Sequence, residues 1–157
     1  MTKQILTLIG VSVLVAIAVN LIHPEGLPWV EDWASRVEAQ AVHEEVALVQ
    51  LSDMLKFMRD GSRLFVDAQP AEKYARAHLP GALSLPFDTL DDQSAEVAEV
   101  LASDQPTVFY CSGPECDDSL LLAVHLRELG CKDVAVFIGG MELWQSELLI
   151  TEGEAVQ

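Results

Sequence analysis

The sequence predicts an α/β domain with a mainly parallel sheet, preceded by one membrane-spanning helix. Short runs rich in β-branched and aromatic residues alternate with segments of helical periodicity, which is the pattern of α/β proteins. These runs are apolar at consecutive positions, as expected of parallel strands that are buried on both faces. Residues 4–22 contain no charged side chain and are long enough to cross a bilayer as one helix.

Composition limits the partners that the protein can have. The chain has 157 residues, of which 50% are hydrophobic, and this suffices for one domain of ordinary size plus an extension. Its 25 acidic and 9 basic residues give a net charge of -16, which argues against binding of nucleic acid or of an anionic membrane surface. We expect any charged partner to be cationic.

The first 23 residues are predicted to be an uncleaved transmembrane anchor. Lys3 precedes the apolar run, and three acidic residues follow it before Arg36, so the positive-inside rule places the N-terminus in the cytoplasm and the rest of the chain outside. Two alternatives stay open. Residues 39–41 have the A-x-A form of a signal-peptidase site, although they lie far beyond the apolar run, and the run could also be a buried helix.

The remaining elements follow in order after the anchor. We expect a juxtamembrane connector at 24–41, a globular domain at 42–150 and an acidic tail at 151–157. Strands are predicted at 46–50, 64–67, 83–85, 107–110 and 134–138, and helices at 52–59, 71–77, 94–101 and 120–129. Ser52 is expected to cap the first of these helices, and Gly61 to end it.

The loop that follows the strand at 107–110 is the predicted functional site. Cys111 ends this strand and is followed by a short Gly/Pro loop and then by a helix. Backbone N–H groups of such a loop, together with the helix N-terminus, can hold a thiolate or an anion. The loop contains Glu115, Asp117 and Asp118 but neither Lys nor Arg.

Four segments, in this order, resemble the rhodanese (sulfurtransferase) homology domain. They are LFVDAQPAEKYARAHLPGALSLPFD at 64–88, VFYC at 108–111, LLAVHLRELGCKDV at 121–134 and VFIGGMELW at 136–144. The resemblance covers about 45–146 and implies an α/β fold with a central, mostly parallel five-stranded sheet. It also implies that the thiolate of Cys111 takes a sulfane sulfur as a persulfide and passes it to cyanide, a thiol or a protein.

The sequence departs from the family pattern at two positions. The family loop carries basic residues that recognise the thiosulfate dianion, whereas Cys116 stands here where such a residue is expected. The common Asp-x-Arg motif is replaced by Asp67-Ala68-Gln69. Because nearby carboxylates raise the pKa of a thiol and repel a dianion, we do not expect efficient turnover of thiosulfate.

Cys116 suggests a second chemistry, since it is close enough in sequence to form a disulfide with Cys111. Four readings of the loop remain open: sulfur transfer through Cys111, a thiol-disulfide couple directed at a partner protein, a structural disulfide, and a domain used only for docking. Two cysteines in one loop do not complete a zinc set, so neither a metal nor another cofactor is expected.

The candidate site therefore has a nucleophile, a redox partner and supporting residues. Cys111 is the nucleophile, Cys116 is the resolving or redox partner, and the supporting residues are Ser112, Gly113, Glu115, Asp117 and Asp67. Asp67 is either a supporting group behind the loop or a cap for the following helix. The expected partners are a small sulfane-sulfur donor or a protein thiol, and a membrane through the N-terminal helix.

Overall fold

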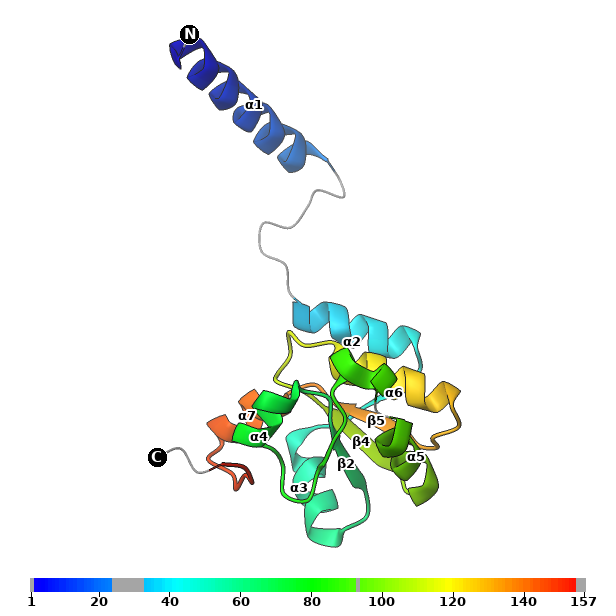
Figure 1. Cartoon of the computed structure of the whole chain (residues 1–157). Helices are drawn as coiled ribbons and strands as arrows, with labels where there is room; N and C mark the ends of the chain where they lie inside the picture. Colours follow the sequence, from blue (N-terminus) through cyan, green and yellow to red (C-terminus); the bar gives the residue numbers. More distant parts are fainter. Residues whose placement is uncertain (1, 24–32, 93, 155–157) are drawn as a thin grey trace. The chain divides into compact units, whose positions relative to one another are not determined.

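The computed structural model describes residues 2–23, 33–92 and 94–154. The chain divides into two compact units, residues 1–32 and residues 33–157. The first contains helix α1 (Thr2–Ile22; Figure 1), whose most apolar stretch of 18 residues has a mean hydropathy of 2.7. None of its residues is buried. By length and composition this helix can cross a membrane, as the sequence predicts.

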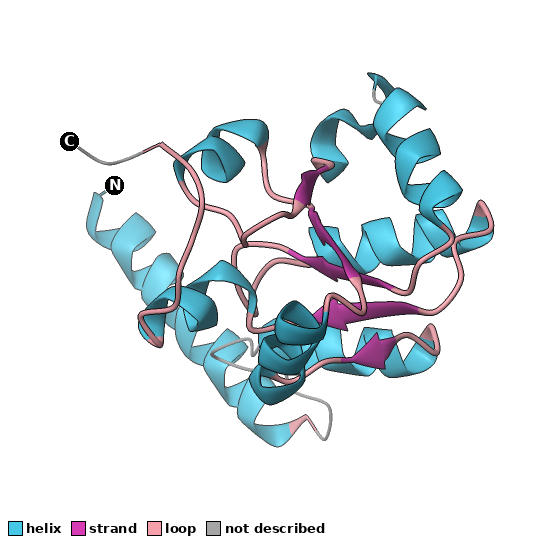
Figure 2. Cartoon of the chain, turned by 90° about the horizontal axis from the view of Figure 1, so that it is seen from below, coloured by secondary structure: helices cyan, strands magenta, loops and turns pink. Residues whose placement is uncertain are grey.

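The second unit is built on a five-stranded sheet in which all neighbouring strands are parallel, as predicted (Figure 2). The strands are β1 (Ala47–Leu48), β2 (Leu64–Asp67), β3 (Leu83–Ser84), β4 (Thr107–Tyr110) and β5 (Val134–Phe137), in the order β1-β5-β4-β2-β3. Asp67 pairs with Tyr110, and Tyr110 pairs with Phe137. The carboxyl ends of the three central strands therefore lie level with one another.

The helices of this unit connect and cover the strands. They are α2 (Trp33–His43), α3 (Leu51–Asp60), α4 (Ala71–Arg76), the 3₁₀ helix η1 (Phe87–Asp92), α5 (Ser94–Ser103), α6 (Asp118–Glu128) and α7 (Gly140–Ser146). Helix α3 begins at Leu51 with Gln50 at its N-cap, so the predicted cap at Ser52 is wrong. Gly61 ends α3 as predicted, with φ 59° and its N–H donating to the carbonyl of Phe57.

Two apolar clusters cover the two faces of the sheet. Val66, Phe109 and Val136 pack with α2, α5 and α6 on one face. Phe65, Tyr110 and other residues of β2, β4 and β5 pack with α3 and α7 on the opposite face. All four residues of β4 are fully buried, which explains why this strand is apolar at consecutive positions.

Helix α2 packs on the sheet domain, although the sequence analysis assigned its first nine residues to the connector at 24–41. Val37 and Ala41 are buried in the cluster that includes α6. The Arg127 guanidinium of α6 donates to the carbonyl of Glu44 and lies 3.6 Å from its carboxylate. Residues 24–32 of the predicted connector lie outside the described residues.

The start of the predicted acidic tail lies against the turn after α4. His78 and Glu152 exchange two backbone hydrogen bonds of 2.8 and 2.9 Å. The Glu152 carboxylate also accepts a hydrogen bond of 3.0 Å from the N–H of Gly81. Residues 155–157 of the tail lie outside the described residues.

Candidate active site

The candidate site lies at the carboxyl end of β4, where the chain enters the loop that leads to α6. Ligand and reaction sites of parallel α/β sheets commonly form at this edge. Cys111 is the first residue after β4 and is 2% exposed. The N-terminal turn of α6 lies beside it, because the Ser119 hydroxyl donates to the Cys111 sulfur at 3.6 Å.

Cys111 and Cys116 are joined by a disulfide, with their Cα atoms 6.3 Å apart. The pair therefore has the proximity that the sequence predicts for a redox couple. The Cys111 sulfur also lies 3.0 Å from the carbonyl oxygen of Cys116 and 3.9 Å from that of Gly113. Within the described residues, the polar contacts of this sulfur are therefore with two carbonyl oxygens and one hydroxyl, whereas the loop sequence predicted backbone N–H groups.

Helix α7 holds the loop in place through its first N–H groups. The N–H of Met141 donates to the carbonyl of Cys111 at 2.9 Å, and the N–H of Glu142 donates to that of Ser112 at 2.8 Å. Gly140 precedes them with φ 54°, and a Cβ there would lie 2.7 Å from the backbone nitrogen of Gly113 and closer still to the Cys111 carbonyl. Only glycine fits this position without displacing the loop.

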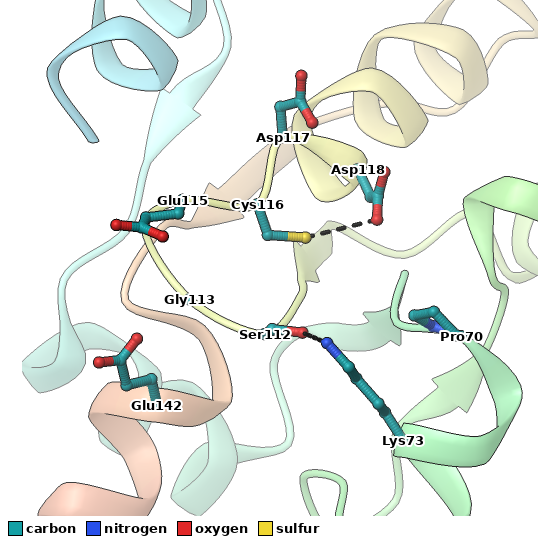
Figure 3. A pocket seen from close by; sticks show the side chains of 9 residues that line it. All are labelled: Pro70, Lys73, Ser112, Gly113, Glu115, Cys116, Asp117, Asp118 and Glu142. Atoms are coloured by element: carbon teal, nitrogen blue, oxygen red, sulfur yellow. Dashed lines mark hydrogen bonds between the residues drawn. The ribbon is translucent and has the colours of Figure 1, made fainter. Parts of the chain in front are cut away.

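A pocket of about 440 Å³ opens beside the disulfide (Figure 3). Its lining comes from the loop, α4, α6 and α7, and consists of Pro70, Lys73, Ser112, Gly113, Glu115, Cys116, Asp117, Asp118 and Glu142. The structure therefore gathers five of the predicted site residues around one cavity. Cys116 lines this pocket and Cys111 does not, so the predicted nucleophile lies beneath its redox partner.

Lys73 supplies a positive charge that the sequence analysis missed. Its ammonium group reaches from α4 and donates to the Ser112 hydroxyl at 2.9 Å (Figure 3). Lys73 also lines an adjacent pocket of about 290 Å³, together with Arg76. Lys73 could have been found from the sequence, because α4 follows β2 directly. The carboxyl ends of β2 and β4, as adjacent parallel strands, meet at one edge of the sheet. The site is therefore less uniformly acidic than its loop.

Asp67 lies behind the loop rather than in the pocket. It is fully buried, and its carboxylate accepts hydrogen bonds from the backbone N–H and the side-chain amide of Gln69 at 2.8 and 3.0 Å. The Ser112 hydroxyl donates to the amide oxygen of Gln69 at 3.3 Å. Pro70 occupies the N-cap of α4, so Asp67 does not cap that helix and instead supports the loop through Gln69.

Burial raises the pKa of Asp67, although hydrogen bonds from Gln69 and Tyr110 oppose the shift. Burial likewise raises the pKa of the Tyr110 hydroxyl, and the nearby Asp67 carboxylate raises it further. That hydroxyl accepts a hydrogen bond of 3.0 Å from the N–H of Leu79. The buried side chains of Asp67 and Tyr110 therefore connect the ends of β2 and β4 beneath the loop.

Asp118, the first residue of α6, also lines the pocket, and folding shifts the pKa of its carboxyl group. Burial raises its pKa, Asp117 and Asp88 raise it further through like-charge repulsion, and Lys73 opposes them. A carboxyl group whose pKa is raised by folding destabilises the fold in its charged form. That penalty is absent below the unfolded-state pKa and is complete once the pH exceeds the folded-state pKa.

Replacing Asp118 with Asn is therefore expected to stabilise the protein at pH 7, by about 0.5 kcal/mol because the group is partly screened by solvent. Urea unfolding at about pH 7 and at about pH 3 measures this, and the gain should vanish at the lower pH. Glu115→Gln is the matched control, since Glu115 is exposed and lines the same pocket. An equal gain in the control, or a gain that persists at the lower pH, would contradict the repulsion.

Within the described residues, no group of three or more His, Cys, Asp or Glu side chains is placed to hold a metal ion. Cys131 is the third cysteine, and it is buried and unpaired with another cysteine. Burial raises the pKa of its thiol, and a contact with Thr107 opposes the shift. Both cysteines of the disulfide therefore lie in the loop, and the third does not.

Comparison with known proteins gives the family. Residues 50–147, more than half of the chain, match the model of the rhodanese-like domain. The chain is 32% identical over 109 residues to an HTH-type transcriptional regulator of Mycobacterium tuberculosis. That match covers 67% of this chain and 45% of the regulator, so the chain spans less than half of its relative's length.

Solved structures agree on the fold. A protein of Bacillus halodurans superposes with a TM-score of 0.61 at 25% identity, covering 76% of this chain and 85% of that one. The polysulfide-sulfur transferase homodimer of Wolinella succinogenes superposes with a TM-score of 0.58 at 18% identity, covering 79% of this chain and 92% of that one. With its five-stranded parallel sheet and its cysteine after the central strand, the chain belongs to the rhodanese-like domain family.

Proposed function

We propose that the protein carries or transfers sulfane sulfur through a persulfide on Cys111, with Cys116 as the redox partner of that residue. The observation that carries this proposal is the position of Cys111 after the central strand, beneath a pocket and bonded to Cys116. The similarity in fold to a polysulfide-sulfur transferase supports it.

The chemistry balances without a cofactor. In the reduced protein, the Cys111 thiolate attacks the terminal sulfur of a persulfide R–S–SH, the sulfur–sulfur bond breaks, and RS⁻ leaves. An acceptor thiolate then attacks the outer sulfur of the Cys111 persulfide and restores the Cys111 thiolate. If Cys116 instead attacks the inner sulfur, hydrosulfide leaves and the observed disulfide forms.

The charge around the pocket favours a neutral or cationic substrate over a dianion. Its lining contains four carboxylates, from Glu115, Asp117, Asp118 and Glu142. Lys73 is the cation among the described lining residues, and its ammonium group is engaged with Ser112. We therefore propose a neutral persulfide or a thiol on another protein as the substrate, rather than free thiosulfate.

The observed disulfide favours one second candidate, a thiol-disulfide couple that exchanges electrons with a partner protein. The two functions differ in what leaves the protein. Sulfur transfer delivers a sulfur atom to the acceptor, whereas the redox function delivers only two electrons. An experiment that follows the sulfur atom therefore separates them.

That experiment uses the reduced full chain in detergent, with a small alkyl persulfide isotopically labelled in its outer sulfur as donor and a small thiol as acceptor. We expect each protein molecule to transfer labelled sulfur to several acceptor molecules, which become persulfides. The Cys131→Ser variant should transfer sulfur at an unchanged rate, because Cys131 is buried away from the loop. Cycling between dithiol and disulfide without labelled acceptor would support the redox function instead.

Restoring a basic residue at position 116 is expected to raise thiosulfate turnover. In Cys116→Arg, a charge-assisted hydrogen bond to the dianion is worth about 1.5 to 3 kcal/mol, so turnover should rise about tenfold or more relative to Cys116→Ser. The serine variant is the control because it removes the disulfide without adding charge. Steady-state kinetics with thiosulfate and cyanide measure the ratio, and equal rates would contradict the electrostatic argument.

We also propose that the domain lies outside the cytoplasm, attached through α1. The charge distribution around the apolar run supports this orientation. The buried positions of Val37 and Ala41 in α2 support an uncleaved anchor, since cleavage after the A-x-A sequence would remove Val37 from the core. Proteolysis of intact spheroplasts tests the proposal: the domain should be digested from outside, and protection until lysis would overturn it.

A further inference from the structure

We infer that, in the oxidised protein, an incoming thiolate or hydrosulfide attacks the sulfur of Cys116 and releases Cys111. Cys116 is then the residue that first bonds to the substrate, and Cys111 is the leaving group. This deepens the proposed function and rests on it only in treating the Cys111–Cys116 disulfide as reactive.

Access to the two sulfur atoms differs. An attacking thiolate approaches a disulfide in line with its sulfur–sulfur bond, so the reaction depends on which sulfur can be reached. Cys116 lines the 440 Å³ pocket and is partly exposed, whereas Cys111 is 2% exposed and does not line it. Figure 3 shows the Cys116 sulfur at the pocket between Asp118 and Ser112. Cys116 is therefore the sulfur that solvent-borne nucleophiles reach.

The surroundings of the two sulfur atoms also favour Cys111 as the leaving group. The Ser119 hydroxyl lies 3.6 Å from the Cys111 sulfur and can donate to a thiolate there. The carbonyl oxygens of Cys116 and Gly113 lie 3.0 and 3.9 Å from the same sulfur, but they carry only partial negative charge. The Cys116 sulfur lies 3.5 Å from a carboxylate oxygen of Asp118, which would repel a thiolate. Because a leaving thiolate departs faster when it is better stabilised, cleavage should place the electron pair on Cys111.

The exchange step balances in atoms and electrons. RS⁻ bonds to the Cys116 sulfur, the disulfide breaks, and its electron pair remains on Cys111, which takes a proton from solvent. The resulting thiol can then donate to the carbonyl of Cys116, which lies 3.0 Å away. With hydrosulfide as the nucleophile, Cys116 becomes a persulfide. Cys111, once it has returned its proton to solvent, can take the outer sulfur of this persulfide as a thiolate and leave a Cys116 thiolate. The disulfide is thus the oxidant that converts sulfide into sulfane sulfur.

The test identifies which cysteine carries the adduct. The oxidised full chain in detergent is mixed with a limiting amount of 2-mercaptoethanol, and free thiols are trapped at short times by excess alkylating agent. Cleavage after Glu115 then puts the two cysteines on separate peptides for mass analysis. We expect mercaptoethanol on the Cys116 peptide and the alkyl group on the Cys111 peptide, in a ratio of roughly ten to one or more.

A reversed or even distribution of the adduct would overturn the inference, and so would a disulfide that the thiol does not open. Replacing Ser119 with Ala should slow the first step several-fold by removing the donor to Cys111. The control is Ser146→Ala, which removes an exposed hydroxyl in α7 that donates to the carbonyl of Leu143. Equal rates for the two variants would contradict the assigned leaving group.

The result is independent of the test of sulfur transfer. An adduct on Cys116, in a protein that never delivers labelled sulfur to an acceptor, would support the inference and refute the proposed transfer. Labelled sulfur in the acceptor, together with an adduct on Cys111, would support the proposed transfer and refute the inference. The two claims can therefore fail separately.

Discussion

Replacing Cys111 with Ser is expected to lower sulfur transfer by roughly three orders of magnitude or more, because the covalent intermediate loses its sulfur nucleophile. Replacing Cys116 with Ser should leave persulfide formation on Cys111 in place while abolishing the disulfide. Labelled-sulfur transfer from the alkyl persulfide to a small thiol measures both variants. The pair is closely matched, since each change replaces one sulfur by one oxygen in the same loop.

The alternative outcomes of this pair are informative. If Cys111→Ser retains transfer and Cys116→Ser loses it, Cys116 carries the sulfur and the family-based assignment of the nucleophile is wrong. If both variants lose transfer equally, the disulfide is an obligatory state of the reaction. Our account requires a large loss for Cys111 and a small one for Cys116.

Replacing Gly140 with Ala is expected to destabilise the fold by about 3 kcal/mol and to abolish transfer. Part of this comes from its φ of 54°, since a left-handed conformation costs a residue with a Cβ about 1 to 2 kcal/mol. The remainder comes from the new Cβ, which would meet the carbonyl of Cys111 and the nitrogen of Gly113. Relief of this contact would move the loop away from α7 and displace Cys111.

Gly61→Ala is the matched control for this prediction. Gly61 has a nearly identical φ of 59°, but no atom lies within 4 Å of a Cβ built there. It should therefore show the conformational cost alone, about 1 to 2 kcal/mol, with normal sulfur transfer. Urea unfolding and transfer assays on both variants separate strain from contact. Equal effects would mean that the loop does not depend on its close approach to Gly140.

Local pattern predicted much of the fold. The strands at 64–67 and 107–110 occur with the predicted bounds, because continuous apolar runs followed by polar residues mark buried parallel strands. The prediction was less accurate where packing against other elements of the domain determines the structure. Residues 33–41 were assigned to the connector rather than to helix α2, because the burial of Val37 and Ala41 against α6 is not contained in any local pattern.

The site was predicted in its loop but not in its surroundings. The short sequence separation of Cys111 and Cys116 predicts that they can form a disulfide. It also places the acidic residues of the loop beside them. Lys73 was missed because its ammonium group meets Ser112 only after β2 and β4 pair in the sheet. The depth of Cys111 beneath Cys116 could not be predicted either, since it depends on how α7 binds the loop carbonyls.

The mass of the peptide that contains Cys111 shows whether this residue carries sulfane sulfur. The reduced full chain is incubated with the alkyl persulfide, alkylated and cleaved after Glu115, so that Cys111 and Cys116 lie on different peptides. The account predicts that the Cys111 peptide gains one sulfur atom and loses it when an acceptor thiol is added before alkylation. A Cys111 peptide that never gains sulfur, while the disulfide still opens and closes, would contradict it.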